Sequence, residues 1–397
     1  MSDAAPERDE RDSSAPKRRG KVRKRHTVGK VLLASVLVIA MVSGLGTIWL
    51  YRHLNGNLNV LDVTSQLENR PDKVDVAGPQ EPLNVLVMGS DSRDCAGCNI
   101  DNLTGGGQRS DTTILFHLSA DRKRAYGISV PRDLIVNRPD CKAKDGSTIP
   151  GGDGVMWNEA FSVGGPACTI QQFEQLTGIR LDHFVVVNFE GFQGMVDAIG
   201  GVEVCIPEPI VDPAHGINIE AGTRKIKGKE ALNYVRERYV VGNGSDIGRM
   251  KRQQAFIASM AHQVVTAGTL ARPDHLVRFL DSATKSLTVD NGLENVVKIA
   301  QLGIQFKDIG LDNIQFITIP NIPDPADPNR LVWKQPQAKQ VWEKIANDEP
   351  LTKQLSDDVI SAGNLPGSGS SSSSGNGGKG SSSEADKQAL EDAGLCT

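Results

Sequence analysis

Arginine and an acidic residue, in most cases aspartate, recur together in short clusters along the middle of this 397-residue sequence. The clusters are 109–111 (Arg-Ser-Asp), 131–133 (Pro-Arg-Asp), 236–238 (Arg-Glu-Arg) and 246–253 (Asp-Ile-Gly-Arg-Met-Lys-Arg-Gln). A guanidinium group presents a planar fork of N–H donors that matches a phosphate, and carboxylates hold a hard divalent cation. Clusters that contain both residue types therefore predict a site for a diphosphate.

These clusters lie at the ends of apolar runs. The runs and their neighbours are 83–88 before Asp91 and Arg93, 112–118 after Asp111, and 125–130 before Arg132 and Asp133. Such runs are typical of buried strands, and ligand sites in open α/β sheets gather at strand ends. The positions favour a binding site over a solvated charged surface, where ion pairs contribute almost nothing measurable.

Apolar runs rich in β-branched residues alternate with segments of helical periodicity. The predicted strands are 83–88, 112–118, 125–130, 184–187, 202–205 and 314–318. The predicted helices are 169–176, 190–199, 229–239, 248–267 and 337–347. Gly178 and Gly200 stand where a helix would end in the left-handed conformation. The alternation predicts a layered α/β domain with a mixed central sheet.

The predicted helix at 248–267 begins with charged residues. Arg249, Arg252 and Gln253 are three and four positions apart, so they project from one face of the first turns. One interpretation makes Asp246 the N-cap and the arginines a solvated stripe. The other adds a bound phosphate, because two arginines at a helix N-terminus oppose the macrodipole unless an anion compensates them.

A membrane anchor is predicted near the N-terminus. Residues 31–50 are uncharged and apolar over a length that crosses a hydrocarbon core of about 30 Å. Lys and Arg residues at 17–25 place that flank in the cytoplasm and the rest of the chain outside. A cleavable signal peptide is the alternative, but the run exceeds a typical h-region and no Ala-x-Ala-like site follows it.

The composition divides the chain into five parts. We expect a disordered basic cytoplasmic segment (1–27), a transmembrane helix (28–51), a stalk (52–80), one large extracytoplasmic domain (81–348) and a flexible Ser/Gly-rich tail (349–397). The basic segment could instead bind nucleic acid. Because it lies directly before the span, its positive charge is explained more simply by membrane orientation and by attraction to anionic lipid. We therefore expect a membrane as partner and no nucleic acid.

Six cysteines follow the predicted span, in a compartment where disulfides persist. Cys95 and Cys98 form a Cys-x-x-Cys pair, but no second pair completes a zinc site. The sequence leaves the connectivity open, and Cys141 with Cys168 is the first pair expected.

The clusters belong to an ordered series of motifs that resembles the LytR-CpsA-Psr family of bacterial cell-wall enzymes. The series runs through 87–93, 109–112, 128–133, 157–160, 188–192, 196–202, 231–238 and 246–253. The resemblance implies a membrane-anchored α-β-α domain with an apolar tunnel for a lipid chain. It also implies transfer of a glycan phosphate from a polyprenyl-diphosphate carrier to a hydroxyl of peptidoglycan, with release of polyprenyl phosphate.

The resemblance also assigns roles to residues. It implies Mg²⁺ held by Asp91 and Asp111. It implies diphosphate contacts from Arg93, Arg109, Arg132, Arg236, Arg238, Arg249, Arg252 and Gln253, with Arg132, Arg238 and Arg249 foremost. Asp246 completes the site. Apart from the resemblance, the reaction needs a group that accepts the proton of the attacking hydroxyl, and Asp111 or Asp133 is expected in that role. Met156-Trp157-Asn158 departs from the Lys-Ile-Asn of many members, so one cationic contact is absent or supplied elsewhere.

Other interpretations remain open at this point. The same site could hydrolyse the lipid diphosphate with water as acceptor, or the chain could be a non-enzymatic protein that binds wall polymer and regulates. Phosphoryl transfer needs positioning and charge neutralisation and no covalent nucleophile. His117 and His183 are expected as packed residues. Phe173, Phe184, Phe189 and Phe192 suit a lipid tunnel and an ordinary core equally well.

Overall fold

The computed structural model describes residues 27–90, 110–266, 272–355, 359–367 and 384–397. The predictions for Asp91, Arg93, Arg109, Cys95, Cys98 and the basic segment lie outside this range, apart from Thr27. The chain forms two compact units, residues 1–50 and 51–397. We describe each unit by itself.

Helix α1 (Thr27–Asn57) accounts for the described part of the first unit. Its residues from 28 onward are long and apolar enough to cross a membrane, with a mean hydropathy of 2.4 in the most apolar window and no part of that window buried. The predicted N-terminal apolar helix is therefore confirmed. Its last turns, from Tyr51, belong to the second unit.

The second unit is built on a mixed central sheet, as predicted, and the described part of this sheet has eight strands. Its strands, in spatial order, are β1 (Asn59–Val60), β14 (Leu287–Val289), β9 (His183–Asn188), β2 (Leu83–Ser90), β3 (Ser110–Leu118), β4 (Ala125–Val130), β15 (Ile314–Thr318) and β18 (Ile360–Ser361). Strand β2 runs parallel to β9 and β4 parallel to β15, whereas β3 is antiparallel to both of its neighbours. β1 joins the sheet from the segment expected to be a stalk.

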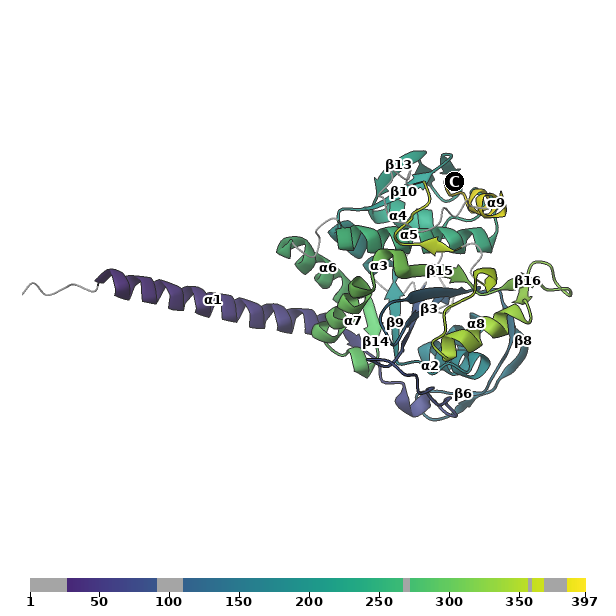
Figure 1. The fold of residues 1–397 in the computed structure, drawn as a ribbon, viewed down its shortest axis with the longest axis horizontal. Helices are drawn as coiled ribbons and strands as arrows, with labels where there is room; N and C mark the ends of the chain where they lie inside the picture. The colour runs from purple at the N-terminus through teal and green to yellow at the C-terminus, as the bar shows by residue number, and fades with distance from the viewer. Residues whose placement is uncertain (1–26, 91–109, 267–271, 356–358, 368–383) are drawn as a thin grey trace, which may run out of the picture. The chain divides into compact units, whose positions relative to one another are not determined.

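Helices cover both faces of this sheet (Figure 1). The helices are α3 (Phe189–Ala198), α4 (Gly228–Arg236) and α5 (Asp246–Thr266) on one face, and α2 (Glu159–Thr177) and α8 (Gln337–Ala346) on the other. Successive strand residues point to opposite faces, so Leu86 and Met88 enter the core with α2 and α8. A sheet buried on both sides explains why its strands read as unbroken apolar runs.

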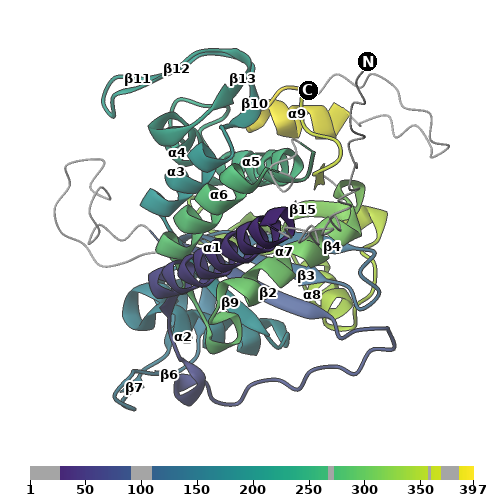
Figure 2. The ribbon, with the colours of Figure 1, turned by 90° about the vertical axis from the view of Figure 1, so that its left-hand side faces the viewer.

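Short elements surround the sheet (Figure 2). Among the described residues, five two-stranded pairs are β5 (Ile135–Arg138) with β8 (Gly152–Met156), β6 (Cys141–Lys142) with β7 (Thr148–Ile149), β10 (Val202–Ile206) with β13 (Gly222–Ile226), β11 (Ile210–Asp212) with β12 (Ile217–Ile219), and β16 (Asn321–Pro323) with β17 (Leu331–Trp333). The further helices are α6 (Pro273–Ser286), α7 (Val296–Ile309) and α9 (Glu384–Asp392). Short 3-10 helices lie at Thr64–Gln66, Asn291–Leu293, Leu311–Asn313 and Lys353–Leu355. The strand predicted at 202–205 therefore lies outside the central sheet. It alternates buried and exposed residues, as a hairpin with one covered face does.

Helix α2 starts ten residues earlier than predicted. Gly164 and Gly165 have non-helical backbone angles and Pro166 follows, so the first turns are separated by a kink from the periodic segment that the sequence shows. A Cβ on Gly164 would lie 1.9 Å from Sγ of Cys168. That close approach accommodates the Cys141–Cys168 disulfide, which confirms the expected pair.

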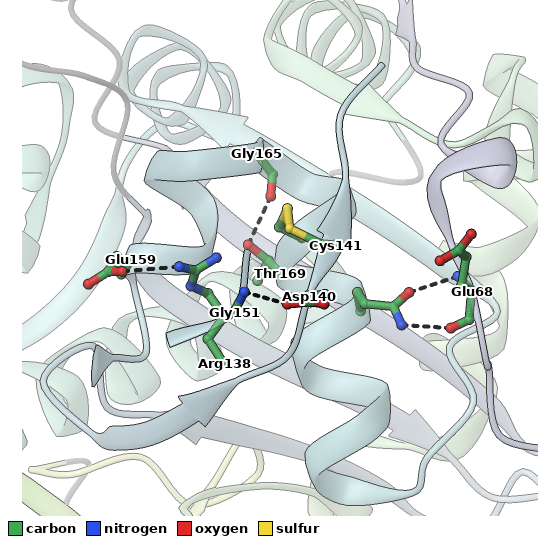
Figure 3. The surroundings of a disulfide bond; sticks show 10 residues. Glu68, Arg138, Asp140, Cys141, Gly151, Glu159, Gly165 and Thr169 are labelled. Carbon is green, nitrogen blue, oxygen red and sulfur yellow. Dashed lines mark hydrogen bonds and ion pairs between the residues drawn. A yellow bond between two sulfur atoms is a disulfide. The ribbon is translucent and has the colours of Figure 1, made fainter. Parts of the chain in front are cut away.

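Polar contacts fix the chain around this disulfide (Figure 3). Asp140 accepts a hydrogen bond from the backbone N–H of Gly151 at 2.6 Å, and Thr169 donates to the carbonyl of Gly165 at 3.0 Å across the kink. Arg138 forms an ion pair with Glu159 at 3.4 Å. The disulfide itself joins β6 to α2, and the Arg138–Glu159 ion pair adds a contact between β5 and the same helix.

The described residues after 348 differ from the expected flexible tail. β18 pairs with β15, and α9 leads to Cys396, which forms a disulfide with Cys205 of β10. Ala393 and Leu395 are buried in an apolar cluster with residues of α5. The prediction of a flexible tail followed the Ser/Gly-rich composition of the whole segment, in which the few apolar residues near its end carry little weight.

Phe173 offers a test of the core between the sheet and α2. It is fully buried, and its ring meets Trp157 and Trp342 edge-on at centroid distances of 6.2 and 5.7 Å. We expect Phe173→Ala to lower the free energy of unfolding by about 3–5 kcal/mol, because the cavity cannot collapse between two indoles. Phe173→Leu should cost less. Urea unfolding of the full chain in detergent measures both, and a loss below about 1 kcal/mol for the alanine variant would contradict this packing.

Candidate functional site

A cavity of about 450 Å³ lies between the sheet and the helices α3, α4 and α5. Thr112, Ile114 and Phe116 line it from alternate positions of β3, which is the spacing of one strand face. Val87 and Gly89 of β2 continue this wall. The face opposite the α2 core is therefore incompletely filled by the protein's own side chains.

Helix α5 gives the cavity its direction. Its lining residues are Arg249, Gln253, Phe256, Ile257 and Met260, whose spacing of four, three, one and three places them on one helix face. At 1.5 Å per residue the charged first member and the apolar last one are roughly 16 Å apart. The cavity thus passes from a cationic end at the start of α5 to an apolar end further along it.

The apolar lining of the cavity answers a question that the sequence left open. Phe189 and Phe192 of α3 line the cavity, together with Met195 and Leu232. Phe173 and Phe184 are instead buried in the core on the other face of the sheet. Two of the four phenylalanines therefore form a chamber wall, and two are ordinary core residues.

The cationic end brings together residues that the sequence scatters over more than a hundred positions. Arg132, which follows β4, forms an ion pair with Asp111 of β3 at 2.8 Å. Its Nε also lies 3.3 Å from Asp246. Asp246 contacts Arg249 at 2.6 Å and Arg238 at 3.8 Å. One buried carboxylate thus holds three guanidinium groups at the same end of the cavity.

Asp246 has this role because of where α5 begins. The helix starts at Asp246 itself, two residues before the predicted start. The side chain that accepts the N–H of Gly248, at 3.0 Å, is Ser245. Ser245 therefore caps this turn, and the interpretation of Asp246 as the N-cap is wrong.

Burial and charge shift the acidic groups in opposite directions. Burial acts to raise the pKa of Asp111, but attraction to Arg132, Arg249 and Arg236 outweighs it and leaves the pKa below its usual value. Burial raises the pKa of Asp246, and its arginine neighbours offset this only in part. Asp111 is therefore ionised at neutral pH, whereas burial outweighs the arginines at Asp246 and leaves its pKa above the usual value.

The arginines at this end respond to the same two influences. Burial acts to lower the pKa of Arg132, but Asp111 and Asp246 outweigh it and the pKa is raised. Burial lowers the pKa of Arg249, which Asp246 offsets in part. The pKa values of Arg132 and Arg249 are therefore shifted in opposite directions, and carboxylate neighbours outweigh burial only at Arg132.

Several buried groups at this end have no hydrogen-bond partner. These are Nε of Arg132, Nε and Nη2 of Arg249, and both carboxylate oxygens of Asp246. Nε of Arg132 and Nη2 of Arg249 lie at ion-pair distance from Oδ1 of Asp246, without the angles of hydrogen bonds. Buried polar groups are nearly always hydrogen-bonded in folded proteins. This cluster is an exception that charge attraction to Asp246 holds together.

Arg236 and Arg238 complete the cationic lining. The guanidinium of Arg236 stacks over the ring of Phe189 at 4.7 Å. Arg238 stacks on Tyr239 at 4.6 Å and donates to its hydroxyl at 2.7 Å. Four arginines, Arg132, Arg236, Arg238 and Arg249, line the cavity against two carboxylates, Asp111 and Glu237. The lining is positively charged, as a diphosphate site requires.

Glu237 was not singled out by the sequence. It is buried, and its carboxylate accepts the backbone N–H groups of Arg238 at 2.8 Å and Tyr239 at 2.7 Å. These bonds shape the loop that carries Arg238. Its place between two arginines was the only signal, and alone it does not distinguish a loop anchor from a solvated charge.

Of two further predicted site residues, one lines the cavity and the other does not. Gln253 lines the cavity, accepts from Thr112 at 3.2 Å and donates to the carbonyl of Val235 at 3.0 Å. Asp133 is not among the lining residues, and it lies 3.6 Å from both Arg132 and Arg330.

Arg252 lies apart from the other predicted arginines. Its side chain is buried, and it donates to the backbone carbonyls of Ala393, at 2.8 Å, and Glu237. It is not among the residues that line the cavity. This position gives no support to its expected phosphate contact.

The histidines fall into two groups. His117 is buried and hydrogen-bonded to Asn84 at 2.8 Å and to Asp348 at 3.1 Å, as a packed histidine would be. His183 contacts Asp290 at 3.1 Å. His215, on the turn between β11 and β12, lines the cavity and lies 2.6 Å from Asp212. No sequence signal pointed to His215, because the hairpin that carries it was not predicted.

The described residues supply one of the two expected metal ligands, Asp111. Within the described ranges, no group of three His, Cys, Asp or Glu side chains could hold a metal ion. Mg²⁺ is commonly bound by one or two carboxylates together with substrate phosphate oxygens and water. The ionised Asp111 at the cationic end therefore fits a magnesium ion that arrives with a diphosphate.

Comparison with known proteins gives a consistent result. The family model described as the LytR_cpsA_psr family matches residues 50–347. Probable cell wall biosynthesis protein LcpB of Corynebacterium glutamicum is 32% identical over 288 residues, which cover 71% of this chain and 62% of that protein. The chain therefore matches less than two thirds of this relative's length.

Two further similarities extend this result. Polyisoprenyl-teichoic acid–peptidoglycan teichoic acid transferase TagU of Halalkalibacterium halodurans is 28% identical, over 73% of this chain and 93% of that protein. The crystal structure of protein gbs0355 from Streptococcus agalactiae shares the fold, with a TM-score of 0.54 and 23% identity over 68% of this chain and 90% of that one. From the match over residues 50–347, the chain belongs to the LytR-CpsA-Psr family.

Proposed function

We propose that this protein is a membrane-anchored phosphotransferase that moves a glycopolymer from a polyprenyl-diphosphate carrier to a hydroxyl of peptidoglycan. The observation that carries the proposal is one cavity that joins four arginines to an apolar chamber. A diphosphate needs the first part, and an isoprenoid chain needs the second. The printed function of the TagU relative, a polyisoprenyl-teichoic acid–peptidoglycan transferase, supports the same chemistry.

The reaction follows from the charges at the cationic end. The acceptor hydroxyl oxygen attacks the phosphorus next to the glycan, the bond from that phosphorus to the bridging oxygen breaks, and polyprenyl phosphate leaves with the electron pair. Arg132, Arg238 and Arg249 orient the diphosphate and stabilise the charge that develops on its oxygens. Mg²⁺, held by Asp111 and Asp91, would neutralise further phosphate charge.

Asp111 is the proposed acceptor of the hydroxyl proton. It lines the cavity and is ionised, whereas Asp133, the other candidate, is not among the lining residues. The lowered pKa of Asp111 makes it a weak base. Weak base assistance suffices for a loose phosphoryl transition state, in which charge neutralisation dominates.

The anchor is proposed to lie with its N-terminal flank in the cytoplasm. The basic residues before the apolar helix support this orientation. The two disulfides among the described residues of the second unit, Cys141–Cys168 and Cys205–Cys396, support an extracytoplasmic domain, since such bonds persist in oxidising compartments. The domain would then meet lipid-linked glycan and peptidoglycan on the same side of the membrane.

Removal of Arg132 tests the diphosphate site. Arg132→Ala should lower kcat/KM by about 10²–10³-fold, because its guanidinium stabilises charge in the transition state. Arg330→Ala is the matched control, since Arg330 contacts Asp133 at 3.6 Å but is not among the lining residues. The assay follows glycan phosphate esterified to peptidoglycan by the full chain in vesicles. Free glycan phosphate as the main product would show hydrolysis instead, and unchanged transfer by Arg132→Ala would exclude its role.

The apolar chamber can be tested with chain length. Met260→Trp narrows the end of the cavity far from the arginines, so a long isoprenoid diphosphate should bind at least about fivefold more weakly. A two-unit isoprenoid diphosphate, which does not reach this depth, should bind as to the wild type. Isothermal titration gives both affinities. An equal effect on both ligands would argue against a lipid chain in this chamber.

The proposed metal ion gives a third test. Transfer should be lost on chelation with EDTA and restored by added Mg²⁺, because the arginines alone leave part of the diphosphate charge unbalanced. Asp111→Asn should raise the Mg²⁺ concentration needed for half-maximal activity. Full activity in EDTA would remove the metal from the proposal and leave the arginine site in place.

A further inference from the structure

The chain has a structured end that lies beyond the family match. The match stops at residue 347, whereas α9 and the residues up to Cys396 fold against the second unit. We call residues 384–397 the C-terminal strap. Figures 1 and 2 both show α9 beside α5, and the disulfide Cys205–Cys396 ties the strap to β10.

The strap contacts the loop that carries Arg238. We call residues 237–245 the arginine loop. The backbone carbonyl of Asp392 accepts the N–H of Asn243 at 2.9 Å. The next carbonyl, of Ala393, accepts from Nη1 of Arg252 at 2.8 Å, and Nη2 of Arg252 donates to the carbonyl of Glu237. One buried guanidinium therefore joins the strap to the start of the arginine loop.

The strap and the arginine loop approach each other so closely that their backbones are in contact. A Cβ on Gly242 would lie 2.1 Å from the carbonyl oxygen of Asp392, and a Cβ on Gly248 would lie 3.0 Å from the same oxygen. On the strap side, a Cβ on Gly394 would meet Cγ1 of Val241 at 2.4 Å. Glycines on both sides thus allow the strap to lie directly on the arginine loop and on the first turn of α5.

The arginine loop is held from two sides. The Glu237 carboxylate binds the N–H groups of Arg238 and Tyr239 from within, and the strap covers Val241 to Asn243 from outside. Burial lowers the pKa of Arg252 to about 10, so Arg252 still carries its charge at neutral pH. The guanidinium can therefore hold both carbonyls with charge-assisted hydrogen bonds.

We propose that Arg252 and the C-terminal strap are positioning elements for the diphosphate site, and that they fix the arginine loop and the first turn of α5 so that Arg238 and Arg249 face the cavity. Arg252 acts through the loop rather than on the substrate. The inference rests on the proposed transfer reaction. It assigns a function to a segment that the family match does not include.

The test combines a substitution that adds a small steric clash with the strap and a second chain from which the strap is removed. Gly248→Ala adds a methyl group 3.0 Å from the Asp392 carbonyl, while alanine is otherwise the better helix former. In the full chain in vesicles, this variant should lower kcat/KM for transfer by about tenfold or more, since small misplacements of binding groups cost up to ~10²-fold. In a chain that ends at residue 383 and carries Cys205→Ser, the same substitution should have no further effect.

Two variants complete the set. Arg252→Lys keeps the charge but cannot reach both carbonyls with a fork of donors, so it should reproduce most of the loss seen on strap removal and add little to it. Lys387→Ala is the control within the strap, because Lys387 pairs only with the exposed Glu384 among the contacts described, at 3.2 Å. It should transfer glycan as the wild type does.

The outcomes separate this inference from the proposed function. If the wild type transfers glycan and the shortened chain transfers it equally fast, the strap has no positioning role. An equal effect of Gly248→Ala with and without the strap would also overturn it. If the wild type shows no transfer, the proposed function fails, and affinity for inorganic pyrophosphate measured by titration still reports on the strap. Weaker pyrophosphate binding in the shortened chain and in Arg252→Lys, with thermal unfolding midpoints close to the wild type, would support the inference.

Discussion

Asp246 is the group on which the cationic end of the cavity depends. Guanidinium groups so close together repel one another, by about 4 kcal/mol for two unit charges 4 Å apart at an effective dielectric constant near 20. The Asp246 carboxylate lies 2.6, 3.3 and 3.8 Å from Arg249, Arg132 and Arg238. It offsets this repulsion while their remaining donors stay available. Burying the Asp246 carboxylate disfavours its charged form, which is why its pKa is raised.

The two faces of the sheet divide stability from function. On the α2 face, Phe173 is fully buried and its ring meets two tryptophans edge-on. On the α5 face, alternate residues of β3 line a cavity of about 450 Å³. The same strands therefore support a dense core and a chamber, because successive side chains point to opposite sides.

Different faces of helix α5 contact the cavity, the central sheet and the C-terminal strap. Arg249 and Phe256 face the cavity, whereas Gln254 donates to Ser129 at 2.8 Å and to Thr318 at 3.1 Å at the sheet. Arg252 binds the strap and Glu237. With 100° between successive residues, one helix can serve a ligand, a sheet and a covering segment within two turns. A shift of this helix would therefore disturb all three at once.

The sequence by itself determined the local elements and the chemistry available to them. Apolar runs located β2, β3, β4, β9 and β15 to within two residues, because both faces of these strands are buried, but they missed the two- and three-residue strands β1, β14 and β18. The clusters of arginine and acidic residues identified the cationic lining. Tertiary structure alone decided which members face the cavity. Arg249 and Arg252 share the same type and local spacing, yet one lines the cavity and the other holds the strap, since only packing sets how α5 is rotated. Phe189 and Phe173 divided between chamber and core for the same reason: periodicity shows that a residue is buried, but its partner comes from a distant part of the chain.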